Sequence, residues 1–177
     1  MSIKNILVAP NKILSDKSSK VTDINSAETK EIIRDLIETA VNQTEPEAAG
    51  LAAPQIGFNK RIILVRDFKV LPNTDKLLIE NKVMINPRII SESKNQDIDW
   101  ESCLSIPGMY GQVKRPEGVK LTYLDENGTE HKIKAKKFFA RVVQHEIDHL
   151  DGIIFTEKMT GKLITEAEYN NLIDEDE

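Results

Sequence analysis

The sequence predicts an α+β fold in which a helix packs against an antiparallel sheet. An amphipathic helical pattern lies near the N-terminus, a group of strand-like segments follows it, and a second helical pattern comes after the strands. Apolar residues recur about every 3.6 residues in a helix and every second residue in a half-buried strand, so the two patterns can be distinguished. The order of helix, grouped strands and helix is typical of the α+β class.

The first helix is predicted from a capping pattern and from apolar spacing. Asn25 and Glu28 have the spacing of a capping box, which marks the start of a helix. The apolar residues that follow recur at the spacing of one helix face; they are Ile32, Ile33, Leu36, Ile37, Ala40 and Val41.

Strands are predicted in the middle of the chain. The segment 44–57 is rich in Ala, Gly and Pro and indicates a loop, which leads into a buried strand at 62–65. Asn127 followed by Gly128 predicts a hairpin turn. Further strands are predicted at 82–90, 119–124 and 130–135.

The second helix is predicted at 138–150 and should end near Gly152. Its apolar residues again recur at helical spacing; they are Phe138, Phe139, Val142, Val143, Ile147 and Leu150. The helix follows the last predicted strand directly, so we expect it to pack on the sheet.

Length and composition indicate one domain. The chain has 177 residues, of which 40% are hydrophobic, so residues 1–177 can form a single domain with one sizeable core. The longest apolar stretches are far shorter than the roughly 18 residues of a membrane span. The N-terminus has neither the apolar core of a signal peptide nor the arginines of a transit peptide. We therefore expect a cytoplasmic protein with no membrane partner.

Charge and cysteine content narrow the range of partners. The net charge of -5 argues against DNA or another nucleic acid as the main partner. Lys132, Lys134, Lys136 and Lys137 form the one local basic cluster, which we interpret as the solvated face of a strand that runs into a helix. Residues 165–177 form an acidic C-terminal tail without a basic residue. The single cysteine cannot form an intramolecular disulfide, so its thiol is available for chemistry or packing.

The second predicted helix carries an H-E-x-x-H motif. His145 and His149 are four residues apart and lie on the same helix face, so both imidazoles can bind one metal ion, while Glu146 can reach a water beside it. With three histidines in 177 residues, the motif seldom arises by chance. The alternative is that both histidines are partly buried structural residues bonded to Asp148 or Asp151.

A catalytic metal site of this type needs a third protein ligand. One large class of metalloproteases uses a glutamate on a later helix, and Glu166 or Glu168 lies at a suitable distance downstream. Cys103 competes with these glutamates, because the prolines and glycines around it indicate an ordered loop after a strand. A lone cysteine is more often a small buried hydrophobe. These residues alone leave the third ligand open.

Three segments, in order, resemble the signature motifs of the peptide deformylase family. They are Gly-Leu-Ala-Ala-Pro-Gln-Ile-Gly at 50–57, Glu-Ser-Cys-Leu-Ser at 101–105 and Gln-His-Glu-Ile-Asp-His-Leu-Asp-Gly at 144–152. The resemblance extends from the first helix to about Phe155. Two positions depart from the pattern, since the family usually has glycine where this chain has Ala48 and Ser102; neither position supplies a reacting side chain.

The resemblance implies a compact α+β domain whose antiparallel strands enclose the motif helix, and it implies the role of each reacting residue. By position, Cys103, His145 and His149 would hold one divalent metal, and Glu146 would transfer protons. The family is expected to bind Fe2+ in the cell, although a Cys-His-His set also accepts Zn2+ or Ni2+. The substrate implied is an N-formyl-methionyl nascent peptide, and the products are formate and a free N-terminus.

The resemblance also implies how substrate is held. The side-chain amide of Gln55 and the backbone N–H of Leu104 would donate hydrogen bonds to the oxyanion of the intermediate. Gly50 would let the backbone approach the peptide closely. Phe138 and Val142 are expected to line the methionine pocket, with simple core packing as the alternative.

A buried ion pair is a further expectation, since the family suggests that Glu101 and Arg115 brace the cysteine loop; a plain surface pair is the alternative. Two other functions stay open. One is a zinc peptidase with Glu166 or Glu168 as third ligand, and the other is a weakly active or non-enzymatic nascent-chain-binding paralogue. We expect a monomer that contacts the ribosome at most transiently and not through the acidic tail.

Overall fold

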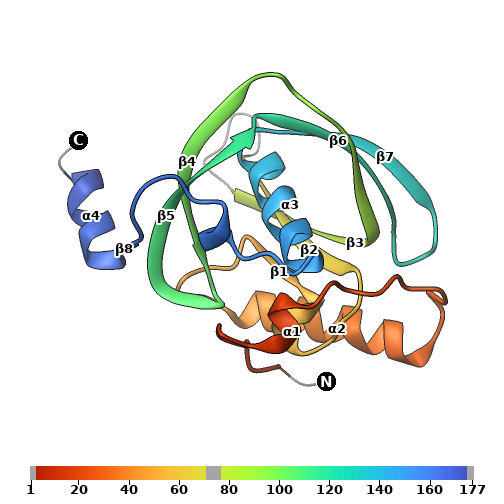
Figure 1. The fold of residues 1–177 in the computed structure, drawn as a ribbon. Helices are drawn as coiled ribbons and strands as arrows, with labels where there is room; N and C mark the ends of the chain where they lie inside the picture. The colour runs from red at the N-terminus through yellow and green to blue at the C-terminus, as the bar shows by residue number, and fades with distance from the viewer. Residues whose placement is uncertain (1–2, 71–76, 175–177) are drawn as a thin grey trace.

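Two antiparallel sheets surround a central helix, α3 (Figure 1). The computed structural model describes residues 3–70 and 77–174. The larger sheet has the order β1-β2-β3-β6-β7; its strands are β1 (Gly50–Ala52), β2 (Ile62–Val70), β3 (Leu77–Glu92), β6 (Gly118–Leu124) and β7 (Glu130–Lys136). The smaller sheet has the order β4-β5-β8; its strands are β4 (Gln96–Cys103), β5 (Ile106–Pro116) and β8 (Ile164–Thr165).

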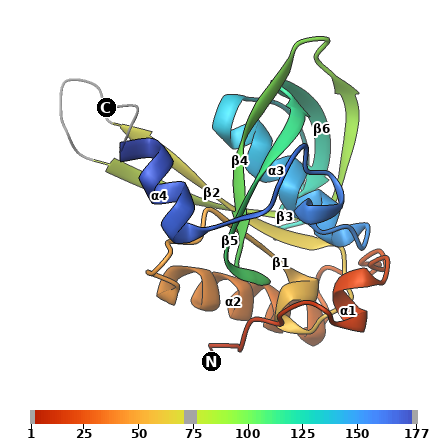
Figure 2. The same cartoon turned by 60° about the vertical axis from the view of Figure 1, so that its left-hand side comes forward.

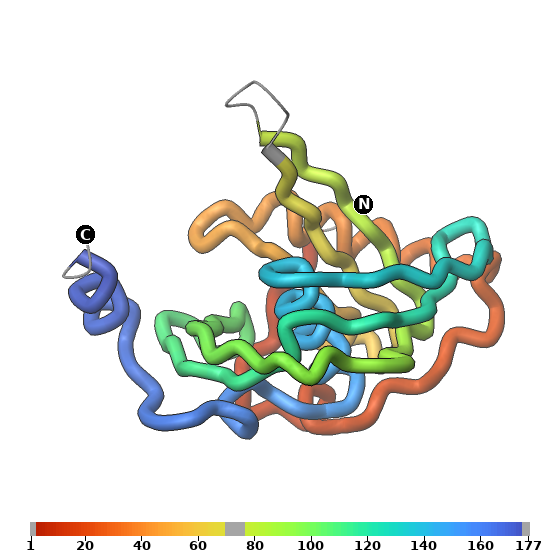
Figure 3. The backbone as a smooth tube through the Cα atoms, turned by 90° about the horizontal axis from the view of Figure 1, so that it is seen from above, coloured from red at the N-terminus to blue at the C-terminus, as the bar shows by residue number. Residues whose placement is uncertain are grey.

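The helices cover the sheets unequally. α2 lies below the larger sheet in Figure 1, α3 lies between the two sheets, and α4 stands apart beside β4 and β5, as Figures 2 and 3 also show. The helical elements are α1 (Lys12–Ser15), α2 (Ala27–Asn42), η1 (Ala53–Ile56), α3 (Lys137–Leu150), η2 (Phe155–Glu157) and α4 (Glu166–Asp174). The predicted α+β class with antiparallel strands is confirmed. Among the described residues, no helix is long and apolar enough to cross a membrane.

The apolar run at 62–65, predicted as a buried strand, belongs to β2, which lies between two helices. Ile62 and Leu64 pack on the α2 side of the sheet, and Ile63 and Val65 pack on the α3 side. Because successive side chains in a strand point to opposite faces, a strand with a helix on each face has to be apolar at every position.

The predicted strands at 82–90, 119–124 and 130–135 are confirmed as parts of β3, β6 and β7. The predicted turn is also present, because Gly128 has a φ of 82° and its N–H donates to Asp125 at 3.0 Å. This positive φ explains the glycine.

The end of α3 was predicted correctly, whereas the start of α2 was not. α3 ends at Leu150, and Gly152 follows with a φ of 76°, as expected for a left-handed stop. The predicted cap at Asn25 is wrong, because Ser26 is the N-cap and its hydroxyl accepts from the Thr29 N–H at 3.1 Å. Both residue types cap helices well, so the pattern alone did not separate the two neighbours.

Candidate active site

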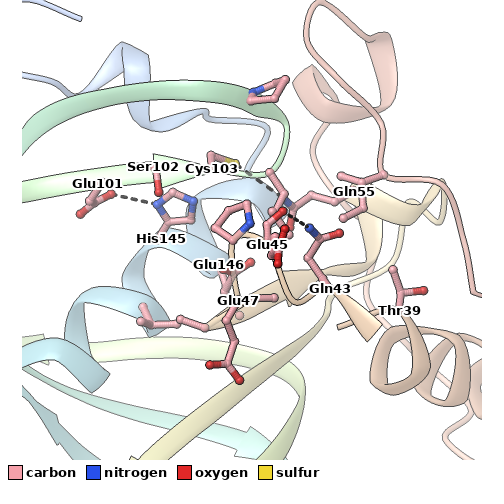
Figure 4. Close-up of a pocket in the computed structure, with 18 of the residues that line it drawn as sticks. Thr39, Gln43, Glu45, Glu47, Gln55, Glu101, Ser102, Cys103, His145 and Glu146 are labelled. Carbon is pink, nitrogen blue, oxygen red and sulfur yellow. Dashed lines mark hydrogen bonds and ion pairs between the residues drawn. The ribbon is translucent and has the colours of Figure 1, made fainter. Parts of the chain in front are cut away.

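Three potential metal-binding side chains meet between α3 and the end of β4. Figure 4 shows two of them, Cys103 and His145, at the cleft. The ligand atoms of Cys103, His145 and His149 all lie within 4.8 Å of one another. Two of them come from one face of α3, and the third comes from the last residue of β4. Glu166 and Glu168 do not belong to this group; Glu168 instead accepts from the Thr165 N–H at 2.7 Å.

The donor set fits a divalent metal. A tetrahedral ion holds thiolate and imidazole donors about 3.3 to 3.6 Å apart, and Cys103 Sγ lies 3.3 Å from His149 Nε2. Burial alone would raise the pKa of the Cys103 thiol, but the neighbouring histidines stabilise the thiolate and hold this pKa well below its usual value. The thiolate is the form that binds metals.

A buried ion network orients His145. Glu101 Oε2 lies 2.8 Å from His145 Nδ1, and a hydrogen bond donated by this nitrogen directs Nε2 toward the cluster. Arg115 donates to both Glu101 oxygens, at 2.6 and 2.9 Å, and to Asp148 at 2.8 Å. The Glu101–Arg115 ion pair is therefore present, and it is buried, since Glu101 is 6% exposed and Arg115 is 3% exposed. This burial excludes the alternative that Glu101 and Arg115 form an ordinary ion pair on the protein surface.

The hydrogen-bond partners of Glu101 keep its carboxylate negatively charged. Burial would raise the pKa of this carboxyl, but hydrogen bonds with Arg115 and His145 lower it well below its usual value. Arg141 donates a further hydrogen bond to Glu101 at 2.8 Å and another to the Val113 carbonyl at 2.9 Å. Arg141 was not predicted as part of the site, although it lies four residues before His145 and therefore on the same helix face.

Glu146 is buried directly against the first strand. The residue is 4% exposed, and its Oε2 has no hydrogen-bond partner among the described residues. Burial raises the pKa of this carboxyl to about 7, and a group that titrates near neutral pH is suited to accept and return a proton. A Cβ on Gly50 would lie only 2.5 Å from Glu146 Oε1, so the close approach at Gly50 is to this side chain.

Gln55 lies in η1, next to Cys103, and is 2% exposed. Its side-chain oxygen, Oε1, accepts from the Ala52 N–H at 2.8 Å. Its side-chain nitrogen, Nε2, lies 3.2 Å from Ser105 Oγ and 3.6 Å from Cys103 Sγ. The carbonyl contact orients the side-chain amide so that its NH2 group points toward the cysteine.

A cleft of about 630 Å³ opens onto this cluster, and Gly50, Gln55 and Leu104 line it together with Glu146. Phe138 and Val142 also line the cleft. Phe138 is 59% exposed, so simple core packing does not explain it, whereas Val142 is buried and packs in the core as well.

A family model described as polypeptide deformylase matches residues 3–163. The chain belongs to the peptide deformylase family. Peptide deformylase 1 of Nostoc is 37% identical over 153 residues, which cover 86% of this chain and 77% of the relative. The deformylase of Roseiflexus is 39% identical over 170 residues, which cover 90% of each.

Solved deformylase structures share the fold. The class I type b enzyme of Acinetobacter baumannii with Met-Ala-Ser bound has a TM-score of 0.78 and 32% identity, and the match covers 89% of this chain and 99% of that one. The Synechococcus elongatus deformylase in complex with actinonin has a TM-score of 0.77 and 32% identity, with 97% and 85% covered. The family and the α+β fold predicted from the sequence are therefore confirmed.

The two departures from the deformylase pattern cause no backbone strain. Among the described non-glycine residues, only Asn86 and Lys137 have positive φ, so Ala48 and Ser102 do not need glycine for their conformation. Ala48 is 3% exposed and packs in the core beside α2.

Proposed function

We propose that this protein is a peptide deformylase, which hydrolyses the N-formyl group of formyl-methionyl peptides and releases formate. The observation that carries the proposal is the group formed by Cys103, His145 and His149 next to the buried carboxyl of Glu146, inside the cleft of a deformylase-family chain. Met-Ala-Ser, which is bound in the Acinetobacter relative, is a peptide of the kind that such a reaction would release.

The metal ligands in this proposal are Cys103, His145 and His149. A divalent ion held there would act as a Lewis acid that activates water and polarises the formyl carbonyl. We propose Fe2+ in the cell, with Zn2+ or Ni2+ as possible substitutes in purified protein, because this donor set accepts all three. Glu101 supports the site by accepting a hydrogen bond from His145.

Glu146 moves the proton in the proposed reaction. Its carboxylate accepts a proton from the attacking water, whose oxygen forms the new bond to the formyl carbon. Its carboxyl then donates this proton to the amide nitrogen, so the carbon–nitrogen bond breaks and a free amine leaves. One water is consumed for each formate and each amine released.

Gln55 and Leu104 would stabilise the negative charge that develops on the carbonyl oxygen. The Gln55 side chain donates from its NH2 group, which the Ala52 contact already orients, and Leu104 donates from its backbone N–H. Donors that are already oriented lose little free energy to reorganisation during the reaction. The apolar parts of Phe138 and Val142 would hold the methionine side chain, and Gly50 would lie beside the peptide backbone.

The test is formate release from a formyl-methionyl peptide by anaerobically prepared, metal-loaded protein. Glu146→Gln should keep the metal but lose at least about a hundredfold in kcat, the usual scale for general acid/base help. Normal turnover in this variant, or no formate from the wild type, would refute the proposal. The cytoplasmic location, the monomeric state and transient contact with the ribosome stay predictions.

A further inference from the structure

The outer face of the larger sheet is covered by a helix over only part of its width. α2 packs against the outward residues of β1, β2 and β3, while α3 packs on the inner face along the whole sheet. In Figure 1, none of the helices among the described residues lies against the outer side of β6 and β7. On these two strands the inward residues are apolar and buried, such as Leu121 and Ala135, and the outward residues alternate with them.

The uncovered part carries a group of cations that we name the basic face. It consists of Arg88 on β3, Lys120 on β6, and Lys132, Lys134 and Lys136 on β7. All five residues are exposed, and none forms an ion pair with a described acidic residue at the distances that define the pairs elsewhere in the protein. The face is therefore strongly positive in a chain with a net charge of -5.

Strand pairing brings these cations together. Lys120 lies directly opposite Lys134, and Thr122 lies between Arg88 and Lys132 across the three strands. Residues that face one another on paired strands have their Cβ atoms about 4.5 to 5.5 Å apart. Like charges at that separation destabilise a sheet, so this arrangement costs folding free energy.

Protection of a sheet edge does not explain the whole basic face. Lysines on an edge strand discourage pairing with other chains, which accounts for the three lysines of β7. Lys120 and Arg88, however, lie on β6 and β3, which have strands on both sides. The acids at the strand ends, Glu92 and Glu130, lie at the margins and leave the centre of the face positive.

We propose that the basic face binds the phosphate backbone of double-helical RNA. Backbone phosphates supply most of the affinity of nucleic-acid binding proteins, through contacts with lysine and arginine. Proteins that bind single strands also offer aromatic side chains on which bases stack, but the basic face has none. The rings of Tyr123 and His131 lie on the opposite, inner side of β6 and β7, where they stack on each other with centroids 5.1 Å apart. Beside the face, Ile90 on β3 is 36% exposed, and a single partly exposed apolar side chain contributes little to insertion into a lipid surface.

This binding goes beyond the proposed hydrolysis and leaves the cleft open. The basic face lies on the opposite side of the sheet from α3, which carries His145 and Glu146. A protein held on RNA through this face would still present its cleft to a peptide. RNA binding can be measured without the reaction, so it fails or succeeds independently of the deformylase proposal.

The experiment measures fluorescence anisotropy of a labelled RNA duplex of about 20 base pairs with metal-loaded, full-length protein. Five phosphate contacts predict a slope of log Kobs against log salt of about -4.5, so binding should weaken by about 500-fold between about 50 and 200 mM KCl. The variant K132Q/K134Q/K136Q should weaken binding at least tenfold at low salt and reduce this slope by about 3.

The matched control is K20Q/K30Q/K162Q, which changes the net charge equally at three exposed lysines outside the basic face. It should bind RNA within about twofold of the wild type, and both triple variants should release formate from a short peptide normally. Equal weakening in both variants would overturn the proposal, because it would show a non-specific charge effect. Tighter binding to phosphatidylserine vesicles than to RNA would also overturn it, as would no RNA binding at low salt.

Discussion

The contact between Gly50 and Glu146 gives a sharp prediction for Gly50→Ala. An ideal Cβ at this position would lie 2.5 Å from Glu146 Oε1 and 2.8 Å from both Cδ and Cγ. Ordinary contacts of a Cβ begin at 3.4 Å, so the carboxyl has to move by about 1 Å. The strand cannot yield easily, because Gly50 pairs with Val65 and the Ala49 carbonyl accepts from the Arg66 N–H at 2.8 Å.

The size of the effect follows from this displacement. A misplacement of about 1 Å in a catalytic group can cost about a hundredfold in rate, which corresponds to about 2.7 kcal/mol of transition-state stabilisation. We therefore expect Gly50→Ala to lower kcat for formate release by about a hundredfold. Bound metal should be unchanged, because the three atoms nearest to the added methyl group all belong to Glu146 and not to the proposed ligands.

A double-mutant cycle with Glu146→Gln is the assay that isolates this mechanism. If the methyl group acts by displacing Glu146, then adding Gly50→Ala to a chain that already lacks the carboxylate should cost less than about threefold more. Two results would refute the reasoning: a single variant that keeps more than a tenth of wild-type kcat, or effects of the two substitutions that multiply in full.

Three further predictions follow from the same site. Cys103→Ala should lose most of its bound metal on dialysis, as measured by elemental analysis, whereas retention would favour a different third ligand. Ala48→Gly and Ser102→Gly, alone or together, should change kcat/KM by less than about tenfold, or about 1.4 kcal/mol; a hundredfold gain would mark a weakened paralogue. Glu101→Gln should destabilise the protein by about 3 kcal/mol in urea unfolding, because it leaves buried guanidinium groups without their charged partner; a loss under about 1 kcal/mol would contradict this.

Local patterns in the sequence determined much of the site. Helical spacing alone places His145 and His149 on one face, because residues four apart on a helix are neighbours wherever that helix packs. The apolar run of β2 and the turn at Gly128 were predictable for the same reason, since strand burial and a positive φ leave their mark on adjacent residues. The resemblance to deformylases then assigned Cys103 and Gln55 to the same site.

Other features depended on long-range packing. A strand before Cys103 was predicted, but the β4–β5 hairpin was not. Most residues of β4 are exposed, so the strand lacks a clear alternation of apolar and polar residues. Helix α4 was also not predicted, since none of its residues is buried. The apolar periodicity on which such predictions rest is produced by burial, and these two elements have little of it.

The closest contacts of the site were decided only by the tertiary structure. The sequence marked Gly50 for a close approach but did not reveal that its neighbour is Glu146, and it did not reveal that Arg141 shares Glu101 with Arg115. These residues lie far apart in the chain, and they meet because strand register and the packing of α3 bring them within hydrogen-bonding or van der Waals distance. A sequence pattern records the periodicity of each element, whereas the distance between two elements is determined by the whole packed core.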